Sequence, residues 1–301
     1  MAASVLRLVV AINPAAAFGA SREVGPRAVE RLRAAGHTVT ALLEPDFASL
    51  QAAAAAALAG DADALVVVGG DGMVSLGVGL VATTGVPLGI VPSGTGNDMA
   101  RGLGIPIGDA DAAIGALLAA LGRTPRTIDV GVARGAGGDI RYFVSVFSGG
   151  FDAAVNERAN RMRRPRGKSR YTLAILRELV TLRPIRYRLT LDGVEESRSA
   201  ILVAVANNVS FGGGMRVAPD ALLDDGLFDV VTLDPVGRVG LLRIFPTVFA
   251  GTHIRDPRVT VRRASRVRIE SPGVVAYADG ERVGPLPIDL EMLPRALAVL
   301  A

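Results

Sequence analysis

Two glycine-rich turns each follow a predicted buried strand in the first third of the sequence. The first turn is Gly69-Gly70-Asp71-Gly72, after the apolar run Ala64–Val68, and the second is Pro92-Ser93-Gly94-Thr95-Gly96-Asn97-Asp98, after Leu88–Val91. Glycines let backbone N–H groups approach an anion closely, and a helix that begins at such a turn adds the positive end of its dipole. Both turns therefore predict a phosphate site, although an aspartate in a turn also has a purely structural explanation.

A carboxylate inside a phosphate-binding turn requires a cation, because it would otherwise repel the phosphate. Asp71 fits if it holds Mg²⁺, directly or through water, and the metal bridges phosphates. Thr95 and Asn97 supply donors for a phosphate or a ribose, and Asp98 either caps a helix or joins an acidic cluster. Neither turn matches the common dinucleotide or Walker A patterns, and the only lysine, Lys168, lacks the upstream glycine that a Walker A motif needs.

A candidate cation site lies between residues 222 and 227. The carbonyl oxygens of Leu222 and Leu227 and the side chain of Asp225 are the hard oxygen ligands that a divalent cation prefers. A β-turn without metal is the commoner explanation of this pattern.

Three further carboxylates are candidate functional residues. Asp129 lies beside a predicted strand near residue 127, where the kind of predicted element changes. Asp279 and Glu281 are separated only by Gly280. Across a glycine turn both of the latter could reach one site, where one acts as a general base. The alternative is a hairpin turn with two solvated carboxylates.

The predicted elements that position these residues change in kind near residue 127. Before it, apolar strands and helices alternate, which is the βαβ order of a doubly wound parallel sheet. After it, short strands predict a mainly antiparallel β domain, interrupted by helices at Tyr171–Leu182 and Gly237–Phe249. We therefore expect an α/β N-terminal domain followed by a β-rich C-terminal domain.

The composition excludes several classes of protein. Half of the 301 residues are hydrophobic, so the chain is not disordered, and the absence of cysteine excludes disulfides and a cysteine nucleophile. Only 4% of the residues are aromatic, so we expect no nucleic-acid partner that reads stacked bases. The uncharged stretch from residue 72 to 97 contains glycines and prolines spaced as turns. We therefore expect no membrane span and a cytoplasmic protein.

Taken together, these motifs resemble the diacylglycerol kinase catalytic-domain family of bacterial lipid kinases, especially its actinobacterial members. The matching pieces follow the family's order, and they are Asn13-Pro14, Gly69-Gly70-Asp71-Gly72, Gly94-Thr95-Gly96-Asn97-Asp98, Ile128-Asp129-Val130-Gly131, Gly212-Gly213-Gly214, Ala218-Pro219-Asp220, Asp225-Gly226 and Asp279-Gly280-Glu281. The resemblance implies the fold shared by NAD kinases and diacylglycerol kinases, with a C-terminus that returns to the first domain. The predicted domains are thus 1–127 with 286–301 for nucleotide, and 128–285 for lipid.

The resemblance also implies roles for individual residues. Glu281 would be the general base with Asp279 beside it, and Asp71 would organise the catalytic Mg²⁺. Leu222, Asp225 and Leu227 would hold a second, structural Mg²⁺. The residues implied to bind ATP or to surround it are Asn13, Pro14, Gly69, Gly70, Asp71, Gly72, Met73, Val74, Ser75, Gly94, Thr95, Asn97, Asp98 and Asp129. Met73 replaces the family's usual threonine, and Ala16-Ala17 replaces its usual serine-glycine.

The predicted reaction is ATP-dependent phosphorylation of the free hydroxyl of diacylglycerol, which gives phosphatidic acid. A sphingoid base or a prenol as acceptor, or a regulator that only binds nucleotide or lipid, stay open as alternatives. The segment Arg158–Arg170 carries seven positive charges and no acid, which predicts peripheral binding to an anionic membrane surface. The sequence leaves a homodimer open.

Overall fold

The structure is a computed structural model in which the chain forms two compact units. It describes residues 5–14, 23–150, 155, 157–158, 162, 173, 177–178 and 183–301. Unit 1 consists of Met1–Val130 with Pro294–Ala301, and unit 2 consists of Gly131–Leu293.

The chain passes from one unit to the other within two of its strands. Strand β5 (Arg126–Gly135) leaves unit 1 for unit 2, and β16 (Ile288–Leu300) returns from unit 2 to unit 1. The domain limits predicted from sequence fall three and eight residues earlier in the chain.

Unit 1 is built on a parallel sheet in the order β2-β1-β3-β4, to which the end of β16 adds. Its strands are β1 (Arg7–Ile12), β2 (Thr38–Leu42), β3 (Ala64–Gly69) and β4 (Leu88–Pro92). Every residue of β3 and β4 is buried, as expected for central strands that are covered on both faces. Val299 of β16 pairs in parallel with Leu88, so the last strand extends the sheet beside β4.

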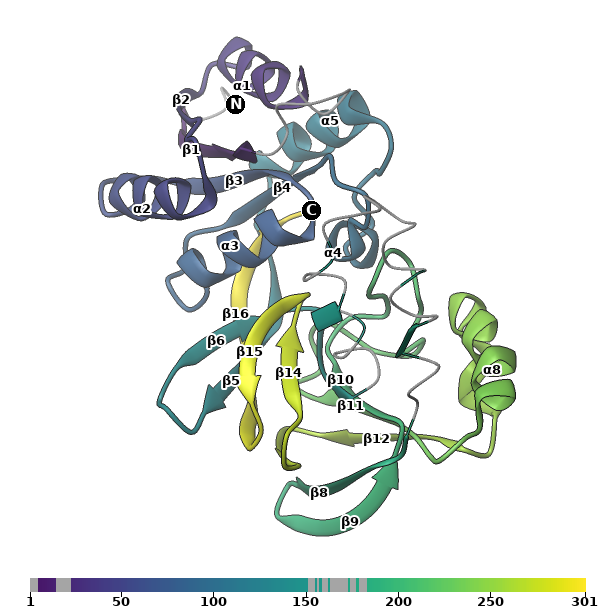
Figure 1. Cartoon of the computed structure of the whole chain (residues 1–301). Coiled ribbons are helices and arrows are strands. Elements are labelled where there is room, and N and C mark those ends of the chain that lie inside the picture. Colours follow the sequence, from purple (N-terminus) through teal and green to yellow (C-terminus); the bar gives the residue numbers. More distant parts are fainter. Residues whose placement is uncertain are drawn as a thin grey trace. The chain divides into compact units, whose positions relative to one another are not determined.

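Helices cover both faces of this sheet (Figure 1). They are α1 (Val24–Ala34), α2 (Phe47–Leu58), α3 (Asp71–Val81), α4 (Asp98–Gly102) and α5 (Ala110–Leu121). Helices α1 and α5 pack against each other, as do α2 and α3. Asp46 and Asp109 cap α2 and α5 by accepting the N–H groups of Ser49 and Ala112, which explains where these two helices begin.

Unit 2 consists mainly of antiparallel strands. One sheet has the order β12-β11-β10-β7-β14-β15, and β13 pairs with β8 and with the first residues of β16. The strands are β6 (Ile140–Phe143), β7 (Val146–Gly150), β8 (Ile185–Leu191), β9 (Val194–Ala200), β10 (Leu202–Ala206), β11 (Phe228–Leu233), β12 (Val259–Ala264), β13 (Arg266–Glu270), β14 (Val275–Ala278) and β15 (Glu281–Pro285). Phe143, Phe147 and Phe228 are fully buried at its centre, where the rings of Phe143 and Phe228 stack 5.7 Å apart.

The helical part of unit 2 that the structure describes is α8 (Arg238–Ala250), followed by the short 3₁₀ helix η3 (Thr252–Arg255). It confirms the helix predicted at Gly237–Phe249. Of the helix predicted at Tyr171–Leu182, only Leu173, Arg177 and Glu178 are described, and all three are helical.

The sequence pattern of Tyr142–Phe147 favours a single strand, but this segment does not form one element. It divides into β6 and β7, and Val144 and Ser145 between them turn their N–H groups to a side chain instead of a neighbouring strand. In the described part of the chain no helix is long and apolar enough to cross a bilayer.

Candidate functional site

The two glycine-rich turns of unit 1 lie side by side, because β3 and β4 are neighbours in the sheet. Gly69 pairs with Pro92, and the N–H of Ser93 donates to the carbonyl of Gly69 at 2.9 Å. A Cβ at Gly94 would lie only 2.4 Å from the Cα of Gly70. Glycine at both positions therefore allows this close approach of the turns, and their N–H groups gather at the carboxyl ends of the strands.

Asp71 and Asp98 form a close pair of carboxylates at this edge of the sheet. The N–H of Asp98 donates to Oδ1 of Asp71 at 2.7 Å, and a Cβ at Gly96 would lie 2.4 Å from Oδ2. Burial raises the pKa of Asp71, and the negative charge of Asp98 raises it further. Asp71 is thus costly to ionise without a cation, and carboxylate oxygens are the ligands that Mg²⁺ prefers.

Asn97 holds the second turn in shape. Its backbone is left-handed at φ +55°, its Oδ1 accepts the N–H of Gly94 at 3.1 Å, and its Nδ2 donates to the carbonyl of Gly94 at 2.8 Å. Thr95, at the tip of the turn, is exposed. Thr95 and Asn97 are the two predicted hydrogen-bond donors to nucleotide. The side chain of Thr95 is exposed to solvent, whereas that of Asn97 stabilises the turn itself.

Met73, which stands where the resemblance implies a threonine, is closely packed. Its side chain is buried, and a Cβ at Gly69 would lie 2.3 Å from its Cγ and 3.2 Å from the Cβ of Asn13. Asn13 also lies at the carboxyl end of β3, since its N–H donates to the carbonyl of Val68 at 3.0 Å. Val74 beside Met73 is buried too, whereas Pro14 and Ser75 are partly exposed. Ala16-Ala17 lies outside the described residues.

Asp129 lies in unit 1 but its visible partner is the returning C-terminal strand. The carboxylate is fully buried, and its Oδ1 accepts the N–H of Arg295 at 2.7 Å. The backbone of Arg295 is left-handed, at φ +53°. Asp129 therefore links the first half of β5 to Arg295 of β16.

In unit 2, Asp279 and Glu281 flank the tight turn between β14 and β15. Asp279 and Gly280 both have positive φ, +50° and +83°, as a two-residue type I′ hairpin requires. The carboxylate of Asp279 accepts the N–H groups of Val144, Ser145 and Val146 at 2.8, 2.9 and 2.9 Å. Glu281 begins β15 and is exposed.

Two buried asparagines support the loop that Asp279 binds. The N–H groups of Asn207 and Asn208 donate to the carbonyl of Ser145 at 2.8 and 3.2 Å, and Nδ2 of Asn207 donates to Val144 at 3.3 Å. Sequence reasoning missed both residues. The available signal was the pair of adjacent amides directly after the buried strand β10.

The candidate cation site at residues 222–227 already has positive charge beside it. Asp225 pairs with the guanidinium of Arg263, and its Oδ1 accepts the N–H of Leu227 at 3.1 Å. Leu222 is exposed. Across the part of the chain that the structure describes, no group of three acidic or histidine side chains gathers as a metal site.

The chain also matches known families along nearly its whole length. Residues 7–133 match the diacylglycerol kinase catalytic domain, and residues 145–301 match the YegS C-terminal NAD kinase beta sandwich-like domain. It is 42% identical to a diacylglycerol kinase of Mycobacterium tuberculosis, over 96% of this chain and 93% of the relative. The chain belongs to the diacylglycerol kinase family. A family member from Bacillus subtilis is 31% identical, over 79% of this chain and 77% of that one.

Solved structures share the fold of this chain. A diacylglycerol kinase from Bacillus anthracis superimposes with a TM-score of 0.72 at 20% identity, covering 98% of this chain and 96% of the other. An NAD kinase from Archaeoglobus fulgidus in complex with ATP superimposes with a TM-score of 0.55 at 14% identity, covering 98% and 94%. The family matches confirm the predicted family, and the solved structures confirm the predicted fold class.

Proposed function

We propose that this protein transfers the γ-phosphoryl group of ATP to the free hydroxyl of diacylglycerol and so makes phosphatidic acid. The observation that carries the proposal is the near full-length 42% identity to a diacylglycerol kinase. The local geometry is consistent with it, because the two adjacent glycine turns present N–H groups and a carboxylate pair at the carboxyl ends of β3 and β4.

Unit 1 contributes the groups that bind nucleotide in this proposal. The N–H groups of the two turns and the N-terminus of α3 attract the phosphates, and exposed Thr95 donates a hydroxyl. Asp71, with Asp98 beside it, would hold Mg²⁺, because a divalent cation would offset both the burial and the repulsion by Asp98 that raise the pKa of Asp71. When bound, the ion supplies positive charge against the phosphate oxygens.

Unit 2 contributes the group that handles the proton. Glu281 accepts the hydroxyl proton of diacylglycerol while that oxygen forms a bond to the γ-phosphorus. The bond between the γ-phosphorus and its bridging oxygen breaks, and ADP leaves with the electron pair. Asp279 is a positioning residue here, since its carboxylate is engaged by the loop at 144–146 and fixes the turn that carries Glu281.

The second, structural Mg²⁺ stays a prediction, and no step of the reaction depends on it. Asp225 has Arg263 as its charge partner, so this carboxylate does not require a metal to be stable. A cation held by Asp225 and the carbonyls of Leu222 and Leu227 would have to compete with that guanidinium.

A water-insoluble acceptor places the enzyme at a membrane. We propose that it is a cytoplasmic protein that binds anionic membrane surfaces peripherally, partly through Arg158–Arg170. Apart from Arg158 and Met162, the residues of this segment lie outside the described part of the chain.

The test is an assay of purified protein with radiolabelled ATP, Mg²⁺ and a panel of lipid acceptors. We expect labelled phosphatidic acid from diacylglycerol, and much less product from a sphingoid base or a prenol. A preference for one of those acceptors would refute the substrate, and no product from any acceptor would refute the kinase activity.

A further inference from the structure

Glu157 contacts both strands of the hairpin that carries Glu281. Its Oε2 accepts the hydroxyl of Tyr277, which belongs to β14, and lies 3.7 Å from Nε of Arg282, which belongs to β15. Tyr277 and Arg282 face each other across the hairpin, and the next pair toward the turn contains Glu281. One carboxylate oxygen therefore links the two strands at the position beside the candidate base.

Strand β15 depends on support of this kind, because it lies at the edge of its sheet. It stands last in the strand order of the described sheet, with β14 as its neighbour. The register of the two strands also shifts between Ala276 and Tyr277, as at a β-bulge. A bulge disrupts the ladder of hydrogen bonds and leaves one residue outside it. The contacts of Glu157 thus tie β15 to β14 immediately beside the irregularity.

Glu157 holds the face of the hairpin that is opposite to Glu281. Paired residues of an antiparallel ladder point to the same face, and successive pairs alternate between the two faces. Tyr277 and Arg282 therefore share one face, and Glu281 lies on the other. Tyr277 is 2% exposed, whereas Glu281 is exposed to solvent. The contact thus supports the backbone of β15 and leaves the carboxylate of Glu281 open to a substrate.

Glu157 is itself held by its neighbours in the chain. Val155, Glu157 and Arg158 are all helical, and Val155 is buried. The guanidinium of Arg158 pairs with the carboxylate of Glu178, which is also helical. The side chain of Glu157 is 24% exposed, so it reaches the hairpin from an anchored and mostly buried position.

We propose that Glu157 is a positioning residue that sets the direction of Glu281 by fixing β15 against β14. The placement of a base relative to its hydroxyl controls the rate of proton transfer, and an error of about 1 Å costs about a hundredfold. Asp279 fixes the turn of the hairpin, and Glu157 fixes the strand that follows it. The inference rests on the proposed function, because that function assigns Glu281 as the base.

Steady-state kinetics with diacylglycerol as acceptor test the proposal. Glu157→Gln keeps an oxygen that accepts the hydroxyl of Tyr277 and removes the charge that pairs with Arg282. Arg282→Gln removes the same ion pair from the other side, and it keeps the fold because the side chain of Arg282 is 55% exposed. A third variant combines both substitutions.

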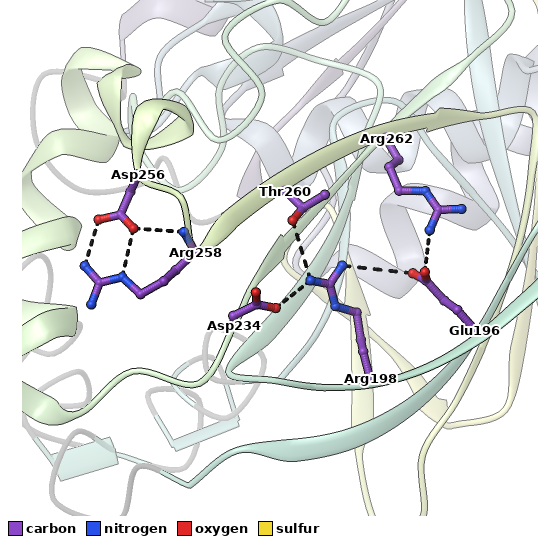
Figure 2. Close-up of polar contacts among 7 residues, drawn as sticks. All are labelled: Glu196, Arg198, Asp234, Asp256, Arg258, Thr260 and Arg262. Atoms are coloured by element: carbon purple, nitrogen blue, oxygen red, sulfur yellow. Dashed lines mark hydrogen bonds and ion pairs between the residues drawn. The ribbon is translucent and has the colours of Figure 1, made fainter.

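Glu196→Gln is the matched control. Like Glu157, Glu196 is a partly exposed glutamate of unit 2 that bridges two groups, in this case Arg198 and Arg262 (Figure 2). Its side chain is 31% exposed, against 24% for Glu157. It lies on β9, which belongs to a different sheet from β15. A loss of kcat shared by both glutamate variants would overturn the proposal, because it would reflect a lost ion pair in general.

We expect Glu157→Gln and Arg282→Gln each to lower kcat about tenfold or more and to leave the KM for ATP unchanged. The double variant should lose no more than either single variant, since both substitutions act through one contact. Glu196→Gln should keep the wild-type kcat. A wild-type kcat in Glu157→Gln would overturn the proposal, and so would losses that multiply in the double variant.

Hydrogen exchange separates this inference from the proposed function. The backbone amides of residues 281–284 should exchange about tenfold faster in Glu157→Gln than in wild type, and at the wild-type rate in Glu196→Gln. Unchanged exchange in Glu157→Gln would overturn the proposal. A wild-type protein that phosphorylates no acceptor, together with the faster exchange in Glu157→Gln, would refute the function alone.

Discussion

The backbone N–H of Asp98 donates a 2.7 Å hydrogen bond to the carboxylate of Asp71. This bond joins the first residue of α4 to the first residue of α3, and it places two carboxylates at the carboxyl ends of neighbouring strands. The backbone contact holds the pair together even though the charges repel. The energetic cost of that repulsion is what a bound cation would relieve.

Replacing Asp71 with asparagine tests the role of this carboxylate. The amide oxygen of Asp71→Asn can still accept the N–H of Asp98, so the turns keep their arrangement. We expect the phosphoryl-transfer rate to fall at least about a hundredfold, because the negative charge proposed to hold Mg²⁺ is lost. A steady-state assay over a range of Mg²⁺ concentrations measures it, and a variant with normal rates at all of them would contradict the assignment.

The same variant has a predicted pH signature in stability. The pKa of Asp71 is raised in the folded state by burial and by Asp98, so the folded protein binds more protons than the unfolded chain just above pH 3.8. The contribution of Asp71 to stability is therefore highest below that pH and declines as pH rises through the folded pKa. Without Mg²⁺, Asp71→Asn should melt at a higher temperature than wild type near neutral pH, and the difference should shrink toward pH 4. A difference that grows toward acid would contradict this account.

Gly94→Ala should separate the two glycine turns. Its Cβ would meet the backbone of Gly70, which cannot move aside as a flexible side chain can. We expect a loss of about 1–3 kcal/mol in the free energy of unfolding and a higher KM for ATP. Gly79→Ala in α3 is the control, since nothing lies within 4 Å of its Cβ, and it should stabilise the protein by up to about 1 kcal/mol. Equal melting curves for both variants would show that the close approach is unimportant.

How far the sequence alone predicts this molecule depends on the range of the interactions. Local sequence signals favour helices at Asp98–Gly102 and Ala110–Leu121, and the structure has α4 and α5 there. Strand β9 was not predictable, because its residues Glu195, Glu196 and Ser197 are polar and its pairing with β8 decides its structure. The local sequence pattern thus predicts the secondary structure of unit 1 better than it predicts the edge strands of unit 2.

The candidate site shows the same limit. The turn at Asp71 could be found from its glycines, but the support of Asp279 by Val144, Ser145 and Val146 joins residues more than 130 positions apart. A second Asp-Gly hairpin, Asp192-Gly193, also binds backbone N–H groups of distant residues. An Asp-Gly dipeptide alone therefore does not distinguish the turn beside the candidate base Glu281 from a turn with only a structural role.

Glu281 and Asp279 should respond differently to substitution. Glu281 is exposed, so Glu281→Gln should lower kcat about a hundredfold to ten-thousandfold with an unchanged melting temperature. Asp279→Ala leaves three backbone donors without their acceptor and should cost about 3 kcal/mol in the free energy of unfolding.

Asp192→Ala is the control for this comparison, because it removes a similar carboxylate from the other Asp-Gly hairpin. It should lower stability and leave kcat near the wild-type value. If Glu281→Gln keeps full kcat, the general base lies elsewhere.

Arg263→Gln tests the predicted second metal site. Without this guanidinium, Asp225 and the nearby Asp229 lose their positive partner, so the variant should melt at a lower temperature in buffer without Mg²⁺. If Leu222, Asp225 and Leu227 bind the ion, added Mg²⁺ should raise the melting temperature more in the variant than in wild type. An equal response of both proteins would argue against a metal there.

The path of β16 has a consequence for how the chain folds during synthesis. Unit 1 takes its final strand from Pro294–Ala301, where Leu300 enters the core and Arg295 supplies the N–H that satisfies Asp129. The first 130 residues leave the ribosome long before this strand is made, so unit 1 must wait with one edge of its sheet uncovered. Completion of unit 1 is therefore a late event, because Pro294–Ala301 joins a structure whose other residues are made much earlier.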